Sequence, residues 1–275
     1  MTGAGTNTYL VGCESIVVVD PGPAIAAHVD ALWQAVAGKL EAILVTHTHH
    51  DHSPAAALLA ARSGAPVYGA LSSHTAWQDA SFAPDVELVD GQRLAFAAAK
   101  LRALHTPGHV DNHFCFLLEE SGLLFAGDHM MQGSTVVIAP PQGDMAAYIA
   151  SLRQLSSQPL QAIAPAHGEL MLEPVQEIER LIAHRMRRET KVYAALVAAG
   201  SVAFEALLAQ VYDDVDPHLH SIAQHSLLAH LLKLEKESRV LRITPAAQSS
   251  ALCSASIAEA GTGARIDNSR WQVER

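Results

Sequence analysis

The stretch Thr46-His47-Thr48-His49-His50-Asp51-His52-Ser53 decides how the rest of this sequence is interpreted. It follows residues 42–45, an apolar run typical of a buried strand, and precedes an Ala- and Leu-rich segment typical of a helix. Alternate residues of an extended backbone face the same way, so His47, His49 and Asp51 are expected to point together. Imidazole and carboxylate groups are the ligands that Zn²⁺ and related ions prefer. The stretch therefore predicts a metal site in the loop between a strand and a helix.

Three later segments repeat this design, with a polar residue placed after a predicted strand and a turn. His109 follows a strand at 101–104, Asp128 follows a strand at 123–126, and His167 follows a strand at 162–164. A two-metal site needs about seven ligand groups, one of them shared between the ions. The sequence supplies seven such groups: His47, His49, Asp51, His52, His109, Asp128 and His167.

The composition describes a globular chain whose first part is acidic. The 275 residues are 49% apolar and 17% charged, which suits one large or two modest domains with real cores. The formal net charge is −10, and residues 1–175 account for it with 6 basic and 16 acidic side chains. This balance argues against a protein that binds nucleic acid mainly through electrostatic attraction.

Other features bear on the cellular compartment. No apolar run approaches the roughly 20 residues that cross a bilayer, and the start of the sequence does not resemble a signal peptide. Cys13, Cys115 and Cys253 are odd in number and far apart, so they predict neither a disulfide framework nor a cysteine-based metal site. We therefore expect no membrane association and a cytoplasmic location.

The hydrophobic pattern divides the chain into three regions. Residues 1–175 alternate short strands with helices, which predicts an α/β catalytic domain; Ser53 and Pro54 are expected to start a helix that Gly64 ends. Residues 176–244 show apolar side chains at helical spacing and then a strand-like run at 240–243, the outline of a small winged-helix-like domain. Residues 245–275 lack periodicity and are expected to be disordered.

With these motifs in order, the sequence resembles the metallo-β-lactamase superfamily, whose signature reads His-x-His-x-Asp-His followed by a distant His, Asp and His. The resemblance implies an αββα sandwich with two metals at one edge. It also implies that the first metal binds His47, His49 and His109. The second metal would bind Asp51, His52 and His167, with Asp128 bridging both.

The resemblance extends beyond the site over roughly residues 3–242. The stretches 183–189 and 231–237 are similar to the β-lactamase-like protein 2 branch, which carries a C-terminal winged-helix-like domain and includes an endoribonuclease that acts on single-stranded RNA. The chain begins close to the early strand at 5–12, where the family has a further strand before it; either the start of the sequence is misassigned or this form lacks that N-terminal edge strand, and we expect the strand to be missing.

Two carboxylates are the predicted catalytic residues. Asp128 would fix the distance between the metals, and Asp51 would help to orient the attacking water. Several further histidines lie next to ligand positions without matching them, and among these His129 is the best candidate for a substrate contact. The others are His50, His105 and His113.

The sequence leaves the substrate and the metal open. The leading interpretation is a metal-dependent hydrolase acting on RNA phosphodiesters, and the alternative is a thioester, lactone or β-lactam hydrolase. A non-catalytic scaffold is a weaker alternative, because no ligand position is lost in this sequence. A flavodiiron-type redox protein is also weaker, because His49 stands where those enzymes have Glu. Zinc is the expected metal, with manganese and iron as alternatives. The expected partner is a small-molecule or single-stranded RNA substrate, and a homodimer is a further prediction.

Overall fold

The computed structural model describes residues 5–243 and 269–274. These residues form two compact units. One contains the described residues up to 136 together with 142–182, and the other contains 137–141 together with the described residues from 183 onward. The boundary therefore falls inside a helix, later than the predicted one at 175. Among the described residues, no helix combines the length and apolarity needed to cross a bilayer.

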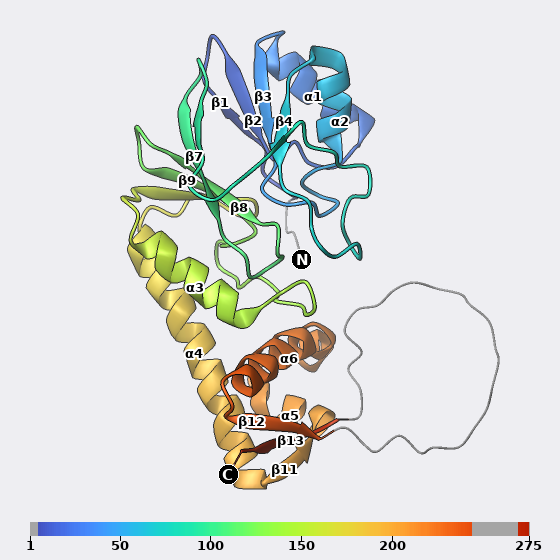
Figure 1. Cartoon of the computed structure of the whole chain (residues 1–275), viewed down its shortest axis with the longest axis vertical. Coiled ribbons are helices and arrows are strands. Elements are labelled where there is room, and N and C mark those ends of the chain that lie inside the picture. Colours follow the sequence, from blue (N-terminus) through green and yellow to red (C-terminus); the bar gives the residue numbers. More distant parts are fainter. Residues whose placement is uncertain (1–4, 244–268, 275) are drawn as a thin grey trace, which may run out of the picture. The chain divides into compact units, whose positions relative to one another are not determined.

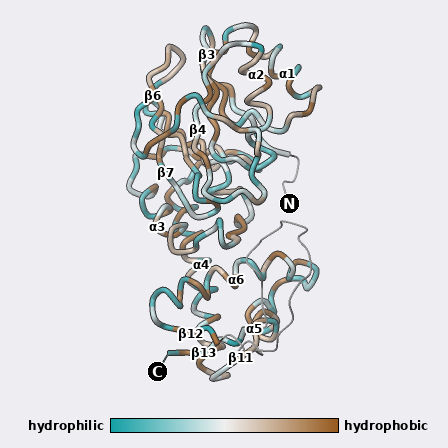
Figure 2. The backbone as a smooth tube through the Cα atoms, turned by 45° about the vertical axis from the view of Figure 1, so that its right-hand side comes forward, coloured by the Kyte–Doolittle hydropathy of each residue, from teal (hydrophilic) through white to brown (hydrophobic). Residues whose placement is uncertain are grey.

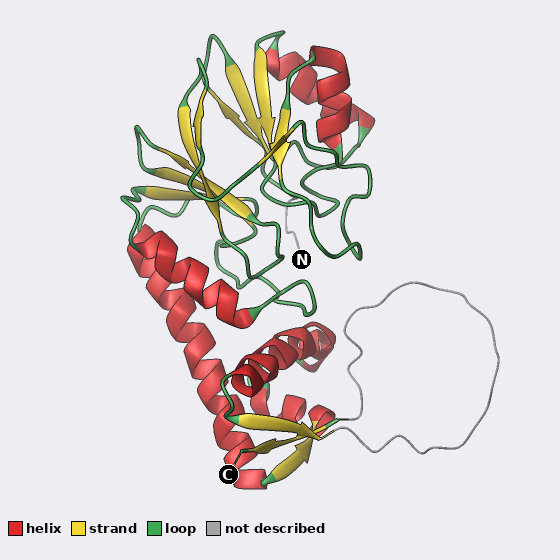
Figure 3. Ribbon diagram, viewed as in Figure 1, coloured by secondary structure: helices red, strands yellow, loops and turns green. Residues whose placement is uncertain are grey.

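Two five-stranded sheets form the centre of the first unit (Figure 3). One sheet has the order β1-β2-β3-β4-β5, with β1 antiparallel to β2 and the remaining neighbours parallel. Its strands span Tyr9–Val11, Ile16–Val19, Leu40–Leu44, Val67–Gly69 and Val86–Glu87. The other sheet has the order β10-β9-β8-β7-β6. In chain order its strands β6 to β10 span Arg93–Ala95, Lys100–His105, Phe114–Leu118, Leu123–Gly127 and Ala162–Pro165.

Helices cover the outer faces of the two sheets. Helices α1 (Ala26–Val36) and α2 (Ala55–Ser63) pack on the first sheet, where they share a buried apolar cluster with Ile43 and Val45. Helix α3 (Met145–Ser156) lies beside the second sheet, next to the first turns of α4 (Pro174–Ala199) (Figure 1). This helix–sheet–sheet–helix order confirms the predicted αββα sandwich.

The alternation of side chains along the strands explains the core. Val17, Val19 and Leu44 face the second sheet, where they meet Leu101 and Phe116 in one fully buried cluster. Ile43 and Val45, which are out of phase with Leu44, face the helices instead. Both faces of these strands are therefore buried, which accounts for their almost continuous apolar sequence (Figure 2).

The start of α2 differs in detail from the prediction. Gly64 ends the helix in the left-handed conformation, with φ of 74°, as expected. Ser53 does not cap the helix, because its hydroxyl donates to Asp79 Oδ2 at 2.8 Å and the cap position, Pro54, carries no side-chain hydrogen bond. The polar side chain at this position fastens a loop distant in sequence rather than the helix end.

The second unit has the elements of a winged helix. Apart from α4, its helices are α5 (Phe204–Val211), a 3₁₀ turn at Pro217–Leu219 and α6 (His220–Lys236). Strands β11 (Ser201–Ala203), β12 (Val240–Ile243) and β13 (Arg270–Val273) form an antiparallel sheet in the order β11-β13-β12. The predicted helical pattern is confirmed for α5 and α6, whose apolar faces meet in one core that includes Leu207, Leu231 and Trp271.

The prediction of a disordered tail is wrong at the end of the chain. Arg270–Val273 forms the central strand of the three-stranded sheet, and Trp271 is only 1% exposed. Residues 244–268 lie outside the described residues. The error has a physical origin, because this four-residue strand gains its stability from β11 and β12, two partners far away along the chain that no local pattern reveals.

We predict that Trp271→Ala destabilises the second unit by about 3–5 kcal/mol, because truncating a fully buried aromatic side chain leaves a cavity in its core. Calorimetric unfolding of the full chain should show the loss. Leu241→Ala is the matched control, since Leu241 lies in the neighbouring strand and is 41% exposed. Equal stability of the two variants would contradict a structural role for the end of the chain.

Candidate metal centre

The predicted ligands lie on loops that follow strands of both sheets. His47 follows β3, His109 follows β7, Asp128 follows β9, and His167 follows β10. The strands end at one edge of the sandwich, so residues far apart in the sequence meet there. All seven predicted ligands are brought together in three overlapping groups, and within each group the ligand atoms lie within 4.8 Å of one another.

Three imidazoles form the first triad. His49 Nδ1 lies 3.0 Å from His47 Nε2 and 3.1 Å from His109 Nε2. The rings meet edge to face, with interplanar angles of 76° for His47 with His49 and 85° for His49 with His109. The nitrogens therefore converge on one point, and the rings do not stack.

The second triad contains one carboxylate and two imidazoles. Asp51 Oδ2 lies 3.4 Å from His167 Nε2 and 3.6 Å from His52 Nε2. Asp128 faces both triads, because its Oδ1 lies 3.1 Å from His167 Nε2 while its Oδ2 lies 3.8 Å from His109 Nε2. This placement matches the bridging position that the sequence resemblance implies.

The spacing of these atoms fits bound metal ions. Ligands held at 2.0–2.2 Å around a tetrahedral ion lie about 3.3–3.6 Å from one another. The separations measured within the two triads run from 3.0 to 3.6 Å and therefore include this range. Within the described part of the chain, His52 Nε2, His167 Nε2 and Asp128 Oδ1 are buried and have no hydrogen-bond partner. Buried polar atoms without partners are costly, so a cation between them accounts for their arrangement.

The tautomers of two histidines also suit metal binding. His52 Nδ1 lies 2.9 Å from Asp20 Oδ2, and His167 Nδ1 lies 3.0 Å from the carbonyl of Gly5. Each acceptor takes a proton from Nδ1, so the neutral ring of each histidine presents the lone pair of Nε2 to the cluster. A ligating histidine ordinarily donates its other N–H to a carboxylate or carbonyl in this way.

Asp20 is a functional residue that the sequence analysis missed. Its buried carboxylate accepts hydrogen bonds from Thr46 N at 2.8 Å, from Thr46 Oγ1 at 2.7 Å and from His52 Nδ1. Because the Thr46 hydroxyl donates to Asp20, its oxygen can accept from His47 Nδ1, 3.1 Å away. The sequence Asp20-Pro21-Gly22 is typical of a turn, although Asp20 follows a buried strand just as the predicted ligands do.

The histidines of the cluster differ in the direction in which their surroundings shift the pKa. Burial, together with the neighbouring His109, lowers the pKa of His49 to about 3. Burial acts in the same direction on His167, but the adjoining carboxylates of Asp128 and Asp51 outweigh it and raise the pKa of His167 to about 10. The pKa of Asp128 lies well below its usual value despite burial, because His52 and His167 stabilise the carboxylate. Two ionised carboxylates among buried imidazoles make a cation-binding cluster.

The histidines that flank the ligands behave differently from one another. His129, the best of these candidates for a substrate contact, is 0% exposed, and the centroid of its ring lies 4.8 Å from that of Tyr148. His113 is equally buried and links Thr106 Oγ1 to the backbone N–H of Asp128. His105 contacts the carbonyl of Asp111, and His50 is exposed.

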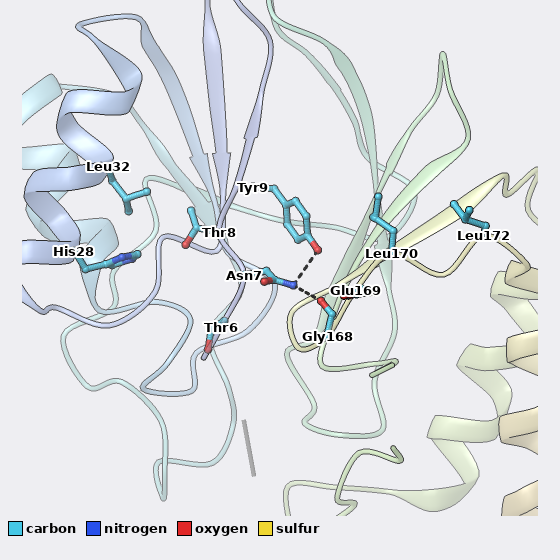
Figure 4. Close-up of a pocket in the computed structure, with 10 residues that line it drawn as sticks. All are labelled: Thr6, Asn7, Thr8, Tyr9, His28, Leu32, Gly168, Glu169, Leu170 and Leu172. Atoms are coloured by element: carbon cyan, nitrogen blue, oxygen red, sulfur yellow. Dashed lines mark hydrogen bonds between the residues drawn. The ribbon is translucent and has the colours of Figure 1, made fainter. Parts of the chain in front are cut away.

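A groove runs beside the second triad, between the first strand and the loop that follows His167 (Figure 4). Its volume is ≈ 790 Å³. Thr6 lines it and donates to Asp51 Oδ2 at 2.9 Å, while Asn7 Nδ2 donates to the carbonyl of Gly168 at 2.8 Å. These bonds fasten the start of the described chain to the loop that carries a predicted ligand.

Two family models match this sequence. Residues 1–167 match the metallo-beta-lactamase superfamily. The chain belongs to the metallo-beta-lactamase superfamily. Residues 204–248 match the beta-lactamase associated winged helix domain, in agreement with the second unit. Membership confirms the predicted fold and supports a hydrolase.

Some relatives of this chain are named as beta-lactamase-like proteins and others as thioesterases. The chain is 30% identical to the beta-lactamase-like protein 2 homolog of Drosophila melanogaster over 261 residues, which are 90% of this chain and 87% of that protein. It is 32% identical to the atrochrysone carboxyl ACP thioesterase of Aspergillus chevalieri over 252 residues, 86% of this chain and 77% of that protein.

Solved structures show the same architecture. The metallo-beta-lactamase family protein TTHA1429 from Thermus thermophilus superposes with a TM-score of 0.71 at 24% identity, covering 87% of this chain and 91% of that one. TTHA1623, described in a di-iron-bound form, gives a TM-score of 0.52 at 30% identity, covering 62% of this chain and 91% of that one.

A second prediction concerns Asp20. Asp20→Asn replaces one accepting oxygen by an NH₂ group, which cannot accept the Nδ1–H of His52. We expect the affinity of this metallo-β-lactamase-fold protein for Zn²⁺ to fall about 10–100-fold, and competition with a chelator measures it. Asp30→Asn serves as the control, because Asp30 is exposed and pairs with Arg62 on the protein surface. Unchanged affinity would show that Asp20 does not orient His52.

A third prediction concerns Gly108, which precedes His109. A Cβ at this position would lie 2.5 Å from Tyr148 Cβ, and φ is +148°, so Gly108→Ala must displace the loop. Metal analysis should then show reduced occupancy at the first triad. Gly133→Ala is the matched control, since φ there is +70° but nothing in the described structure lies within 4 Å of the added Cβ. Full occupancy in Gly108→Ala would exclude this buttressing role.

Proposed function

We propose that this chain is a dinuclear-metal hydrolase that cleaves acyl thioesters. The observation that carries the proposal is the convergence of seven candidate ligand side chains in two triads joined by one carboxylate. In this proposal His47, His49 and His109 bind one ion, and Asp51, His52 and His167 bind the other. Asp128 binds both. Zinc is the proposed ion because five of the seven ligands are imidazoles, and the di-iron form of TTHA1623 makes iron the alternative.

Two divalent ions bound here would supply a water of lowered pKa and stabilise the oxyanion that develops on the substrate. The chain's own carboxylates have separate tasks. Asp128, with its side chain 12% exposed, is held between the triads and sets their separation. The Asp51 side chain is 37% exposed, so it can accept a hydrogen bond from the attacking water and orient it. The pKa of Asp51 is lowered, because the adjoining His167 and His52 outweigh the effect of burial, and the carboxylate therefore stays ionised.

Charge supports a thioester over RNA as the substrate. The acidic first 175 residues would repel a polyanion, whereas an acyl thioester brings no charge to the reacting carbonyl. The name of the Aspergillus chevalieri relative, a carboxyl ACP thioesterase, supports the same choice.

RNA is the second candidate, because the sequence resembles a branch that includes an endoribonuclease, and the basic run Arg185–Arg188 is where a nucleic-acid contact would be sought. Two of its three arginines are used internally. Arg185 is 3% exposed, and Arg188 pairs with Asp214 at 2.7 Å. Arg187 is the exposed member of the run, which leaves little basic surface there for a phosphate backbone. A cytoplasmic location and a homodimer stay predictions from the sequence.

The test compares substrates on one zinc-loaded preparation whose metal content has been measured. We expect release of free thiol from acyl-pantetheine thioesters, no cleavage of labelled single-stranded RNA, and a content of two ions per chain. Asp128→Ala should lower thioester turnover about 10³-fold or more, while Asp30→Asn should retain it. RNA cleavage without thioester cleavage would overturn the proposal in favour of the endoribonuclease alternative.

A further inference from the structure

Residues 70–79 form a loop, here called the lip, that borders the first triad. Each part of the lip is tied to a segment that carries a predicted ligand. The carbonyl of Ala70 accepts from Asn112 Nδ2 at 2.9 Å, and Asp79 N donates to the carbonyl of Thr48 at 2.6 Å. Gln78 pairs with His49 in an isolated antiparallel bridge. The lip is therefore fixed at the mouth of the cluster.

A buried amide network holds the lip from beneath. Thr48 Oγ1 accepts from Asn112 Nδ2 at 2.8 Å and donates to Gln78 Oε1. Gln78 Nε2 donates to Gln142 Oε1 at 3.0 Å, and Gln142 Nε2 donates to the carbonyl of Ala76. These three amide side chains are between 3% and 9% exposed. Such a network specifies one loop conformation, because each polar group would be costly to bury without its partners.

The large side chains that the lip presents outward are apolar. Leu71 is 58% exposed and Trp77 is 51% exposed, although both residue types are usually buried. Trp77 also adopts φ of +62°, a left-handed conformation that is strained for any residue with a Cβ. Strain of this kind persists only where the surroundings enforce it, and it is concentrated at functional sites. The network beneath the lip supplies that enforcement.

We propose that the lip binds the acyl chain of the thioester, with Trp77 as the residue that sets chain-length preference; this inference rests on the proposed function. The lip carries no Lys or Arg and one acidic side chain, Asp79, which is buried and bonded to Ser53. It therefore offers apolar contact without the lysines or arginines that would hold a phosphate chain. Since Gln78 adjoins His49, an acyl chain lying on Trp77 would bring its carbonyl to the cluster.

The experiment measures kcat/KM of the zinc-loaded chain for acetyl- and decanoyl-pantetheine. Trp77→Gly is the chosen variant, because glycine adopts a positive φ without strain and the loop should keep its path. We expect kcat/KM for the decanoyl thioester to fall about 10-fold or more and that for the acetyl thioester to stay within about 2-fold. Trp77→Phe, which keeps a ring, should restore most of the preference. Val89→Ala is the control, since Val89 is 63% exposed outside the lip. Equal losses on both thioesters, or none, would overturn the inference.

A binding measurement separates this inference from the proposed function. Decanoate added to the zinc-loaded parent should change tryptophan fluorescence saturably, butyrate should do so more weakly, and Trp77→Gly should lose the response. A chain that cleaves no thioester but shows this response would refute the proposed function and keep the apolar site. A chain that cleaves thioesters without any Trp77-dependent response would keep the function and refute the site.

Discussion

The buried carboxylate of Asp20 is the interaction on which the metal cluster depends. It lies at the end of β2, and its two oxygens accept the backbone and the hydroxyl of Thr46 and the ring of His52. One side chain thus fixes the entrance of the ligand loop and the tautomer of a ligand within it. Asp20 itself has φ of +51°, so the local backbone is strained in order to aim the carboxylate inward.

The two sheets set the remaining distances. Each sheet delivers loops to the same edge of the sandwich, so the ligands from β3 and from β7, β9 and β10 meet across the core rather than along one strand. The close packing around these loops leaves no space for additional side-chain atoms at two glycines. A Cβ added to Gly127 would lie 2.6 Å from Thr46 Oγ1, and one added to Gly108 would lie as close to Tyr148. The absence of two side chains therefore lets the loops of Asp128 and His109 approach their neighbours.

The sequence identified the side chains that gather in the cluster because their signal is local and chemical. His47, His49, Asp51 and His52 lie within six residues, and each later ligand follows an apolar run with the length and composition of a strand. The sequence could not predict the contacts that support these side chains and the second unit. The role of Asp20, the bond from Ser53 to Asp79 and the strand at Arg270–Val273 all depend on partners distant in sequence. The local sequence is typical of a turn at Asp20, of a helix cap at Ser53 and of a disordered tail at Arg270–Val273. At each place, contacts with partners distant in sequence determine the observed structure instead.

The chemistry of the cluster and the choice of substrate are carried by different parts of the first unit. The cluster is polar and most of its side chains are buried, and nothing in it distinguishes one carbonyl or phosphoryl substrate from another. Discrimination must come from the loops around it, as is general for sites on a common fold. The lip suits this role because hydrogen bonds join it to the ligand loops while its large exposed side chains, Leu71 and Trp77, are apolar. If the lip binds substrate as proposed, a change in Leu71 or Trp77 alters which substrate is held without moving His47, His49 or His109.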